Sequence, residues 1–242
     1  MRRLAIVAAL VLGALAGPAR AQEASVVWKA LLVAGDDSIP AFDNAVRTLA
    51  GKLQWRGVAA VRTLTSRRGV RQADAVATAA NVNRALASLQ VGPGDGCLLF
   101  LTSHGTEAGL DFVRDAQNNH RLYPEDLSRA LDAHCAEAPT VVVISGCHTG
   151  TFIREVMLRP NRIVLTAARR DRPSFGCEFT RRYTYFDGCL IENFDASADW
   201  RQAFDRTNAC IQALESAGNL QPSEPQASFG AVVAGAKLPG VP

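Results

Sequence analysis

Two apolar stretches decide the fold, and the first reads Val141-Val142-Val143-Ile144-Ser145-Gly146-Cys147-His148. The other comes earlier in the chain and reads Leu98-Leu99-Phe100-Leu101-Thr102-Ser103-His104-Gly105. Short apolar runs bounded by turn residues are typical of strands that are buried on both faces of a parallel sheet. We therefore predict two buried strands, with His104 and Cys147 just beyond their carboxyl ends.

The rest of the chain continues this alternation of apolar runs and amphipathic helical stretches, which is the pattern of βαβ units. Further strands are predicted at residues 26–34, 58–64 and 161–168, and helices at residues 124–134, 183–194 and 197–216. Two earlier helices are marked by apolar side chains at helical spacing, namely Phe42, Val46, Leu49 and Leu53, then Val82, Leu86 and Leu89. Asp37 or Ser38 could cap the first of them. The predicted fold class is α/β, a single domain with a mostly parallel central sheet flanked by helices.

The N-terminus has the pattern of a secretion signal. Basic residues at Met1-Arg2-Arg3 precede an apolar run at residues 4–16 and a small-x-small site that ends at Ala21. The run is shorter than the roughly 20 residues that a membrane-spanning helix needs. We expect cleavage after Ala21, which leaves residues 22–242 as a periplasmic or secreted domain with no stable membrane span. An uncleaved N-terminal anchor is the alternative.

The charge balance gives no reason to expect a nucleic acid partner. The whole chain carries a formal net charge of +3, but the segment 1–21 contains three arginines and no acidic residue. Removal of that segment leaves a mature chain with no net charge. Nucleic acid binding relies on concentrated lysine and arginine, so no such partner is predicted. The oligomeric state is not fixed by the sequence.

The six cysteines allow several arrangements. Cys97 lies within an apolar run, where a buried free thiol behaves as a small hydrophobic side chain. If Cys97 and Cys147 both stay reduced, four cysteines remain, and they could form up to two disulfides in any of three pairings. These four are Cys135, Cys177, Cys189 and Cys210.

The chemistry is indicated by His104 and Cys147 together. In an open α/β sheet the carboxyl ends of the strands form the edge where ligands bind. Neighbouring strands would therefore place an imidazole and a thiol across one crevice, and the imidazole can act as the base that activates the thiol. A zinc site is disfavoured because the chain has no Cys-x-x-Cys and no His-Glu-x-x-His motif. We expect no metal and no cofactor.

These residues resemble those of caspase-fold cysteine peptidases, and in detail those of the bacterial secreted branch of the legumain (asparaginyl endopeptidase) family. The resemblance spans roughly residues 26–200 and rests on four segments: Leu31-Leu32-Val33-Ala34-Gly35, Thr102-Ser103-His104-Gly105, Ser145-Gly146-Cys147-His148-Thr149-Gly150, and Thr166-Ala167-Ala168 with Asp171-Arg172-Pro173-Ser174-Phe175-Gly176-Cys177. It implies a caspase-like fold for residues 22–242.

The resemblance also implies roles for individual residues. Cys147 would be the nucleophile that forms an acyl-enzyme, and His104 would take the thiol proton and deliver it to the leaving amine. The backbone N–H groups of Gly105 and Cys147 would form the oxyanion hole. Asn44 lies near the position where some legumains place a residue that orients the histidine, and Asp43 fits that position almost as well.

The resemblance leaves the substrate open. The pocket for the residue before the scissile bond would draw on Asp36 and Asp37 and on the segment from Arg169 to Phe175, which includes Ser174. We expect a peptide or protein substrate, cleaved after Asn or another polar or charged residue. Transpeptidation by the same acyl-enzyme is an alternative, and so is a non-catalytic periplasmic binding or scaffold module.

Overall fold

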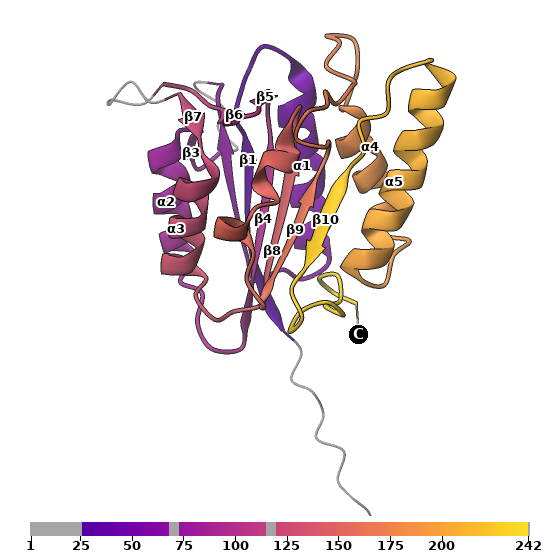
Figure 1. Ribbon diagram of the computed structural model, residues 1–242. Coiled ribbons are helices and arrows are strands. Elements are labelled where there is room, and N and C mark those ends of the chain that lie inside the picture. Colours follow the sequence, from indigo (N-terminus) through magenta and orange to yellow (C-terminus); the bar gives the residue numbers. More distant parts are fainter. Residues whose placement is uncertain (1–25, 68–72, 115–119, 242) are drawn as a thin grey trace, which may run out of the picture.

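The architecture is a seven-stranded sheet between two layers of helices, and the computed structural model describes residues 26–67, 73–114 and 120–241 (Figure 1). The predicted secretion signal lies outside these residues. The strand order is β10-β9-β8-β4-β1-β2-β3. The strands are β1 (Val27–Ala34), β2 (Ala60–Thr65), β3 (Ala75–Val76), β4 (Asp95–Thr102), β8 (Thr140–Ser145), β9 (Arg162–Thr166) and β10 (Gln226–Phe229). All neighbours are parallel except β10, which is antiparallel to β9.

Each face of the sheet has its own hydrophobic core. Along β4, Leu98 and Phe100 point to one core, while Leu99 and Leu101 point to the other. The first core is covered by α1 (Pro40–Trp55), α4 (Tyr185–Phe194) and α5 (Trp200–Ala217). The second is covered by α2 (Ala79–Ser88) and α3 (Pro124–His134), and by the short 3-10 helices η1 (Thr149–Phe152) and η2 (Glu155–Met157). Figure 1 shows α2 and α3 on one side of the sheet and α4 and α5 on the other.

A small antiparallel sheet follows β4 in the chain. It consists of β5 (Gly105–Thr106), β6 (Gly109–Asp111) and β7 (Arg121–Leu122), in that order. Its first strand begins directly after His104, and the backbone N–H of Asp111 donates to the carbonyl oxygen of His104 at 2.9 Å. This sheet therefore holds the backbone of His104 just beyond the end of β4.

The predicted fold class is confirmed, with one α/β domain, a mostly parallel central sheet and flanking helices. The short strand β3, the small sheet and the edge strand β10 were not predicted. Residues 226–229, which follow the last predicted helix, pair with β9. Within the described ranges, no helix is long and apolar enough to cross a membrane.

The start of α1 differs from the prediction. The N-cap position is held by Ile39, which makes no side-chain capping hydrogen bond, and Pro40 occupies the first turn. Ser38 was a candidate cap, but its hydroxyl is directed to other partners: it donates to Asp36 and contacts the ring of His104. The side chain that could have capped the helix is therefore used at the edge of the sheet.

The cysteine prediction was wrong for Cys97. Cys97 forms a disulfide with Cys135, and Cys189 forms one with Cys210, so Cys147 and Cys177 are the free cysteines. The residue after α3 returns to the start of β4, which brings the Cα atoms of Cys97 and Cys135 within 5.9 Å. That distance suits a disulfide. Cys147 is free, as predicted.

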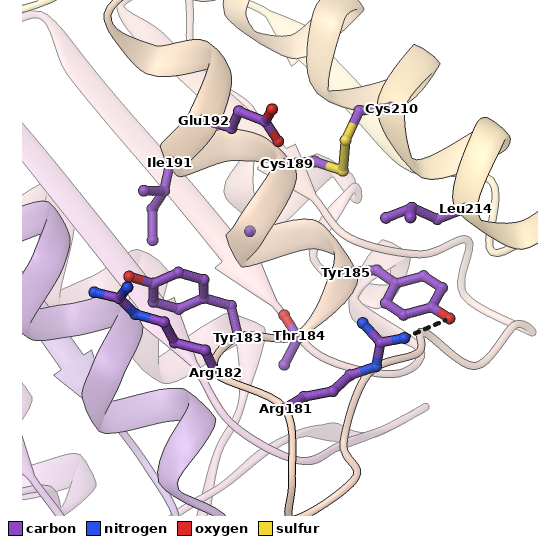
Figure 2. A pocket seen from close by; sticks show the side chains of 11 residues that line it. Arg181, Arg182, Tyr183, Thr184, Tyr185, Cys189, Ile191, Glu192, Cys210 and Leu214 are labelled. Atoms are coloured by element: carbon purple, nitrogen blue, oxygen red, sulfur yellow. Dashed lines mark hydrogen bonds between the residues drawn. A yellow bond between two sulfur atoms is a disulfide. The ribbon is translucent and has the colours of Figure 1, made fainter.

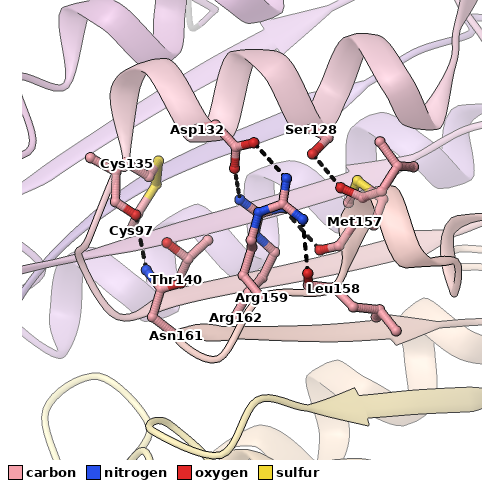
Figure 3. Close-up of polar contacts among 12 residues, drawn as sticks. Cys97, Ser128, Asp132, Cys135, Thr140, Met157, Leu158, Arg159, Asn161 and Arg162 are labelled. Carbon is pink, nitrogen blue, oxygen red and sulfur yellow. Dashed lines mark hydrogen bonds and ion pairs between the residues drawn. A yellow bond between two sulfur atoms is a disulfide. The ribbon is translucent and has the colours of Figure 1, made fainter.

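The amino-terminal end of β9 carries an ion pair whose guanidinium is buried (Figure 3). The guanidinium of Arg162, whose side chain is 2% exposed, binds the carboxylate of Asp132 at 2.7 Å and donates to the carbonyl oxygen of Met157 at 2.9 Å. Arg159 contacts the same carboxylate at 2.8 Å. Burial by itself would raise the pKa of Asp132, but the hydrogen bonds and the charges of the two arginines together lower it. This cluster joins α3 to β9 at the edge opposite His104 and Cys147.

Candidate active site

His104 and Cys147 follow two strands that are direct neighbours. In the register of β4 and β8, Thr102 is opposite Ser145, and the N–H of Ser103 donates to the carbonyl oxygen of Ser145 at 3.1 Å. His104 lies two residues beyond Thr102, and Cys147 two residues beyond Ser145. The structure thus brings the imidazole and the thiol to the same edge of the sheet, which is the arrangement that the sequence predicts.

Two glycines let the segments that carry these side chains approach closely. A Cβ atom on Gly105 would lie 2.2 Å from the carbonyl oxygen of Cys147, and one on Gly146 would lie 2.6 Å from the carbonyl oxygen of Ser103. Both distances are far below a normal contact, so any larger residue would have to push the segments apart. Each glycine therefore keeps one reactive segment against the other.

The Cys147 thiol is half-buried and lies against Ser174. The backbone N–H of Ser174 points to the sulfur at 3.3 Å, and the carbonyl oxygen of Ser174 lies 3.5 Å from it. An N–H donor favours the thiolate form of a cysteine, whereas a carbonyl acceptor favours the thiol. Among the described contacts, no hydrogen bond joins this sulfur directly to the His104 ring.

The His104 ring is held by residues of the turn between β1 and α1. Its Nε2 lies 3.0 Å from the hydroxyl of Ser38 and 3.8 Å from a carboxylate oxygen of Asp36. The same oxygen of Asp36 accepts from the hydroxyl of Ser38 and from its N–H. The ring also packs edge-on against Phe42, with 5.3 Å between the ring centres. Ser38 is therefore a candidate orienting residue that the sequence suggested only as a helix cap.

Asn44 does not lie at His104. Its amide donates to the carbonyl oxygen of Arg182 at 3.1 Å, and its oxygen accepts from Arg47. Asp43 points elsewhere as well, because its carboxylate binds Thr65 and Arg67. Both residues belong to the first turns of α1, whereas the ring of His104 is contacted by the turn before this helix. The structure places the orienting contact a few residues earlier than the resemblance suggested.

The Thr166-Ala167-Ala168 segment is tied to the nucleophile loop through Thr149. The buried hydroxyl of Thr149 donates to the carbonyl oxygen of Gly146 at 3.0 Å and accepts from the N–H groups of Ala167 and Ala168 at 3.1 and 3.3 Å. His148 has a left-handed backbone conformation, and its N–H donates to the carbonyl oxygen of Arg172 at 2.8 Å. These bonds fix the segment that runs on to Ser174.

Of the remaining predicted pocket residues, Arg169 belongs to this segment, whereas Asp36 and Asp37 lie in the turn between β1 and α1. Arg169 binds Asp171 at 2.6 Å and Glu224 at 2.5 Å. The Arg169 hydrogen bond lowers the pKa of Asp171 to about 2. Asp36 is engaged by Ser38, while Asp37 is exposed. In the described part of the chain, no group of three His, Cys, Asp or Glu side chains is arranged to hold a metal ion.

Two cavities in the described part of the chain lie away from the candidate site, because neither is lined by Cys147 or His104. One, of about 370 Å³, lies at the start of α4 against α5 and is bordered by the Cys189–Cys210 disulfide (Figure 2). Figure 2 shows Arg181 beside Tyr185, with the guanidinium 4.5 Å from the ring centre. The other, of about 580 Å³, lies between α1 and β2.

Comparison with known proteins identifies the family. The structure of protein GSU0716 from Geobacter sulfurreducens is similar in fold, with a TM-score of 0.56, 15% sequence identity, and coverage of 83% of this chain and 92% of that chain. No curated protein sequence matches the chain. The model of the peptidase C13 family matches residues 73–219, which is more than half of the chain and includes both His104 and Cys147. The chain therefore belongs to the peptidase C13 family, the family of the legumains.

Proposed function

We propose that the protein is a cysteine endopeptidase in which Cys147 is the nucleophile and His104 is the general base. Its family supports a cysteine peptidase in general terms. The observation that carries the specific assignment is the close approach of the two segments at Gly105 and Cys147, beyond the carboxyl ends of paired strands. A thiol and an imidazole at this edge have the chemistry of an activated cysteine nucleophile.

The contacts of His104 indicate which ring nitrogen acts as the base. The hydroxyl of Ser38 donates to Asp36, so its oxygen is available to accept a hydrogen bond from Nε2–H of His104. With the proton on Nε2, Nδ1 keeps its lone pair and can take the proton of the Cys147 thiol. The nearby Asp36 carboxylate would then stabilise the imidazolium, as an acidic partner does in other catalytic triads.

The reaction then proceeds through a thioester. The proton moves from the Cys147 thiol to Nδ1 of His104. The thiolate then attacks the carbonyl carbon of the scissile peptide bond, and the oxygen of that carbonyl gains the negative charge. When the C–N bond breaks, the leaving amine receives the proton from His104. Water then attacks the thioester with His104 as the base, which releases the acid and restores the thiol.

The oxyanion would be bound by the backbone N–H groups of Gly105 and Cys147. The glycine at position 105 keeps this space open, because a Cβ there would collide with the Cys147 carbonyl. Donors of this kind stabilise the transition state by about 3 kcal/mol each. We expect a peptide substrate with Asn or another polar or charged residue before the scissile bond, bordered by Asp36, Asp37, Arg169 and Ser174.

We also propose that the enzyme acts in the periplasm or outside the cell. The N-terminal signal pattern supports this location, and so do the disulfides Cys97–Cys135 and Cys189–Cys210. Disulfides of this kind persist in oxidising compartments and are rare in the cytosol.

The test is hydrolysis of a fluorogenic peptide library that varies the residue before the cleaved bond. Wild type is compared under mild reduction with Cys147→Ala and His104→Ala, and with His134→Ala as a matched control, since His134 lies on α3 and contacts Asn83. Cleavage that requires both Cys147 and His104 but not His134 supports the proposal. Cleavage that survives either substitution overturns the mechanism.

Two further outcomes separate the alternatives. A folded protein with a reduced Cys147 that cleaves no peptide would contradict the peptidase and favour the binding module. Addition of an amine-bearing acceptor peptide, followed by mass spectrometry of the products, distinguishes hydrolysis from transpeptidation by the same thioester.

A further inference from the structure

A fully buried carboxyl lies at the ends of the two strands that lead to the reactive residues. Asp187 is in the first turn of α4, is 0% exposed, and follows Thr184, whose hydroxyl accepts from the Asp187 N–H at 3.1 Å. The pKa of Asp187 is influenced by burial and by the hydroxyl side chains of Ser145, Thr102 and Thr184, and by no cation. The burial of this carboxyl without a cationic partner needs an explanation, because an unpaired buried charge lowers the stability of the folded state.

The contacts of Asp187 reach both strands that carry the site. The hydroxyl of Thr102, the last residue of β4, donates to Oδ2 of Asp187 at 2.7 Å. The hydroxyl of Ser145, the last residue of β8, lies near the same carboxyl and favours its charged form. Neither this hydroxyl nor Oδ1 of Asp187 has a hydrogen-bond partner among the described residues.

The two unpartnered atoms are consistent with a protonated carboxyl. Burial raises the pKa of Asp187 above its usual range, against the opposing hydrogen bonds of Ser145, Thr102 and Thr184. A neutral acid with its proton on Oδ1 can donate to the Ser145 oxygen while Oδ2 accepts from Thr102. One side chain then satisfies the ends of two adjacent strands.

We propose that Asp187 is a positioning residue that links Thr102 to Ser145 and thereby fixes His104 relative to Cys147. This inference rests on the proposed function, because it assigns Asp187 to the alignment of the same pair. Thr102 and Ser145 each lie two residues before the reactive side chain of their strand, so a shift of either strand end moves that side chain directly. Loss of alignment by about 1 Å costs an enzyme up to roughly a hundredfold in rate.

A neutral Asp187 is also compatible with the negative charges that form on Cys147 and on the substrate oxygen during the proposed reaction. A negative charge beneath the site would oppose formation of the Cys147 thiolate and of the oxyanion. A neutral acid provides the same hydrogen bonds without that repulsion.

The test compares Asp187→Asn with Asp187→Leu. Asparagine retains one acceptor and one donor and so imitates the protonated acid, whereas leucine has similar branching and no polar atom. Asp205→Leu is the matched control, because Asp205 is exposed on α5. We expect Asp187→Leu to lower kcat/KM at least about tenfold, mainly through kcat, and Asp187→Asn to rescue most of that loss. An Asn variant as impaired as the Leu variant, or a Leu variant with wild-type kcat/KM, would overturn the proposal.

A second pair of variants covers the case in which Asp187→Leu does not fold. Thr102→Val and Ser145→Ala remove one hydroxyl each with little change in shape. We expect each to slow peptide hydrolysis at least about threefold, with unfolding followed by circular dichroism to show that the fold is intact. Wild-type rates in both variants would contradict the link between the strand ends.

Iodoacetamide alkylation of Cys147 separates failure of this inference from failure of the proposed function. His104→Ala is expected to slow alkylation if the two residues interact at all. If His104→Ala slows it but Asp187→Leu does not, the positioning role is wrong and the Cys–His pair stands. If His104→Ala has no effect, the pair itself is wrong, whatever Asp187 does.

Discussion

The backbone of Gly105 lies so close to Cys147 that a Cβ atom at position 105 would be 2.2 Å from the Cys147 carbonyl oxygen. This contact couples the loop that follows the histidine to the loop that contains the nucleophile. Since both loops continue directly from paired strands, the geometry of the site depends on the backbone as much as on the two reactive side chains.

Gly105→Ala should therefore inactivate the enzyme without removing any reactive group. The added methyl group must push the Cys147 segment away, so we expect kcat/KM to fall by at least about a hundredfold. Gly51→Ala is the control, because a Cβ there meets nothing within 4 Å. It should leave activity intact and stabilise α1 by roughly 0.5 kcal/mol. Full activity of Gly105→Ala in peptide hydrolysis would contradict the close contact.

Ser38→Ala should impair orientation of the histidine. Its hydroxyl lies 3.0 Å from Nε2 of His104, and its loss removes a hydrogen bond that holds the ring. We expect kcat to fall about tenfold while KM changes little. Ser88→Ala, which removes a hydroxyl from the exposed end of α2, is the control. Equal kinetics for the two variants would show that Ser38 has no orienting role.

Native protein should take up one iodoacetamide per chain at neutral pH, at Cys147. Cys177 is also free, but burial raises the pKa of its thiol to about 12. A protonated thiol is a poor nucleophile. Denaturation without reduction should expose the second thiol, as intact mass and peptide mapping would show. A disulfide through Cys147, or labelling of Cys177 in the native state, would contradict this assignment.

The same thiol should make stability depend on pH in alkaline solution. The pKa of Cys177 is raised from 9.0 to about 12, so the folded state retains a proton that the unfolded chain loses first. Stability is therefore full below about pH 9 and falls as the pH rises towards about 12. Cys177→Ala should flatten that part of the profile in chemical denaturation. Parallel profiles for the two proteins would mean that Cys177 is not the titrating group.

Asp132→Ala should weaken the fold but not the chemistry. The substitution leaves the buried guanidinium of Arg162 without its carboxylate (Figure 3). Loss of one partner of a buried pair is strongly destabilising, but Asp132 is 42% exposed, so we expect about 2 kcal/mol. The exposed pair Asp126–Arg129 is the control, and its Asp126→Ala variant should cost under about 1 kcal/mol. Thermal unfolding and peptide hydrolysis together test both parts of the expectation.

The sequence was informative where one residue type has one physical role. Apolar runs such as Leu98 to Leu101 indicate buried strands. They predicted five strands of the sheet and the edge where His104 and Cys147 meet. β10 was missed because its four residues are all partly buried and follow a segment with no apolar period. An antiparallel edge strand of this length depends on the neighbour it pairs with more than on its own composition.

The contacts of single side chains were less accessible to prediction. Ser38 fits a helix cap as well as a histidine partner, and only the turn after β1 decides between them. Cys97 has the surroundings of a buried free thiol until the end of α3 is seen to return beside it. Asp187 carried no signal at all, because a lone acid at the start of a helix is usually a surface residue.

The late position of β10 has a consequence for how the chain reaches its native state. β9 is bounded on one side by β8 and on the other by β10, and β10 comes from residues 226–229. Until those residues have left the ribosome, one edge of a hydrophobic parallel sheet has unpaired N–H and C=O groups, which can template pairing with another chain. We therefore expect the C-terminal segment to protect this edge of the sheet from pairing with another chain. A truncation before residue 226 should lower solubility even though Cys147 and His104 remain.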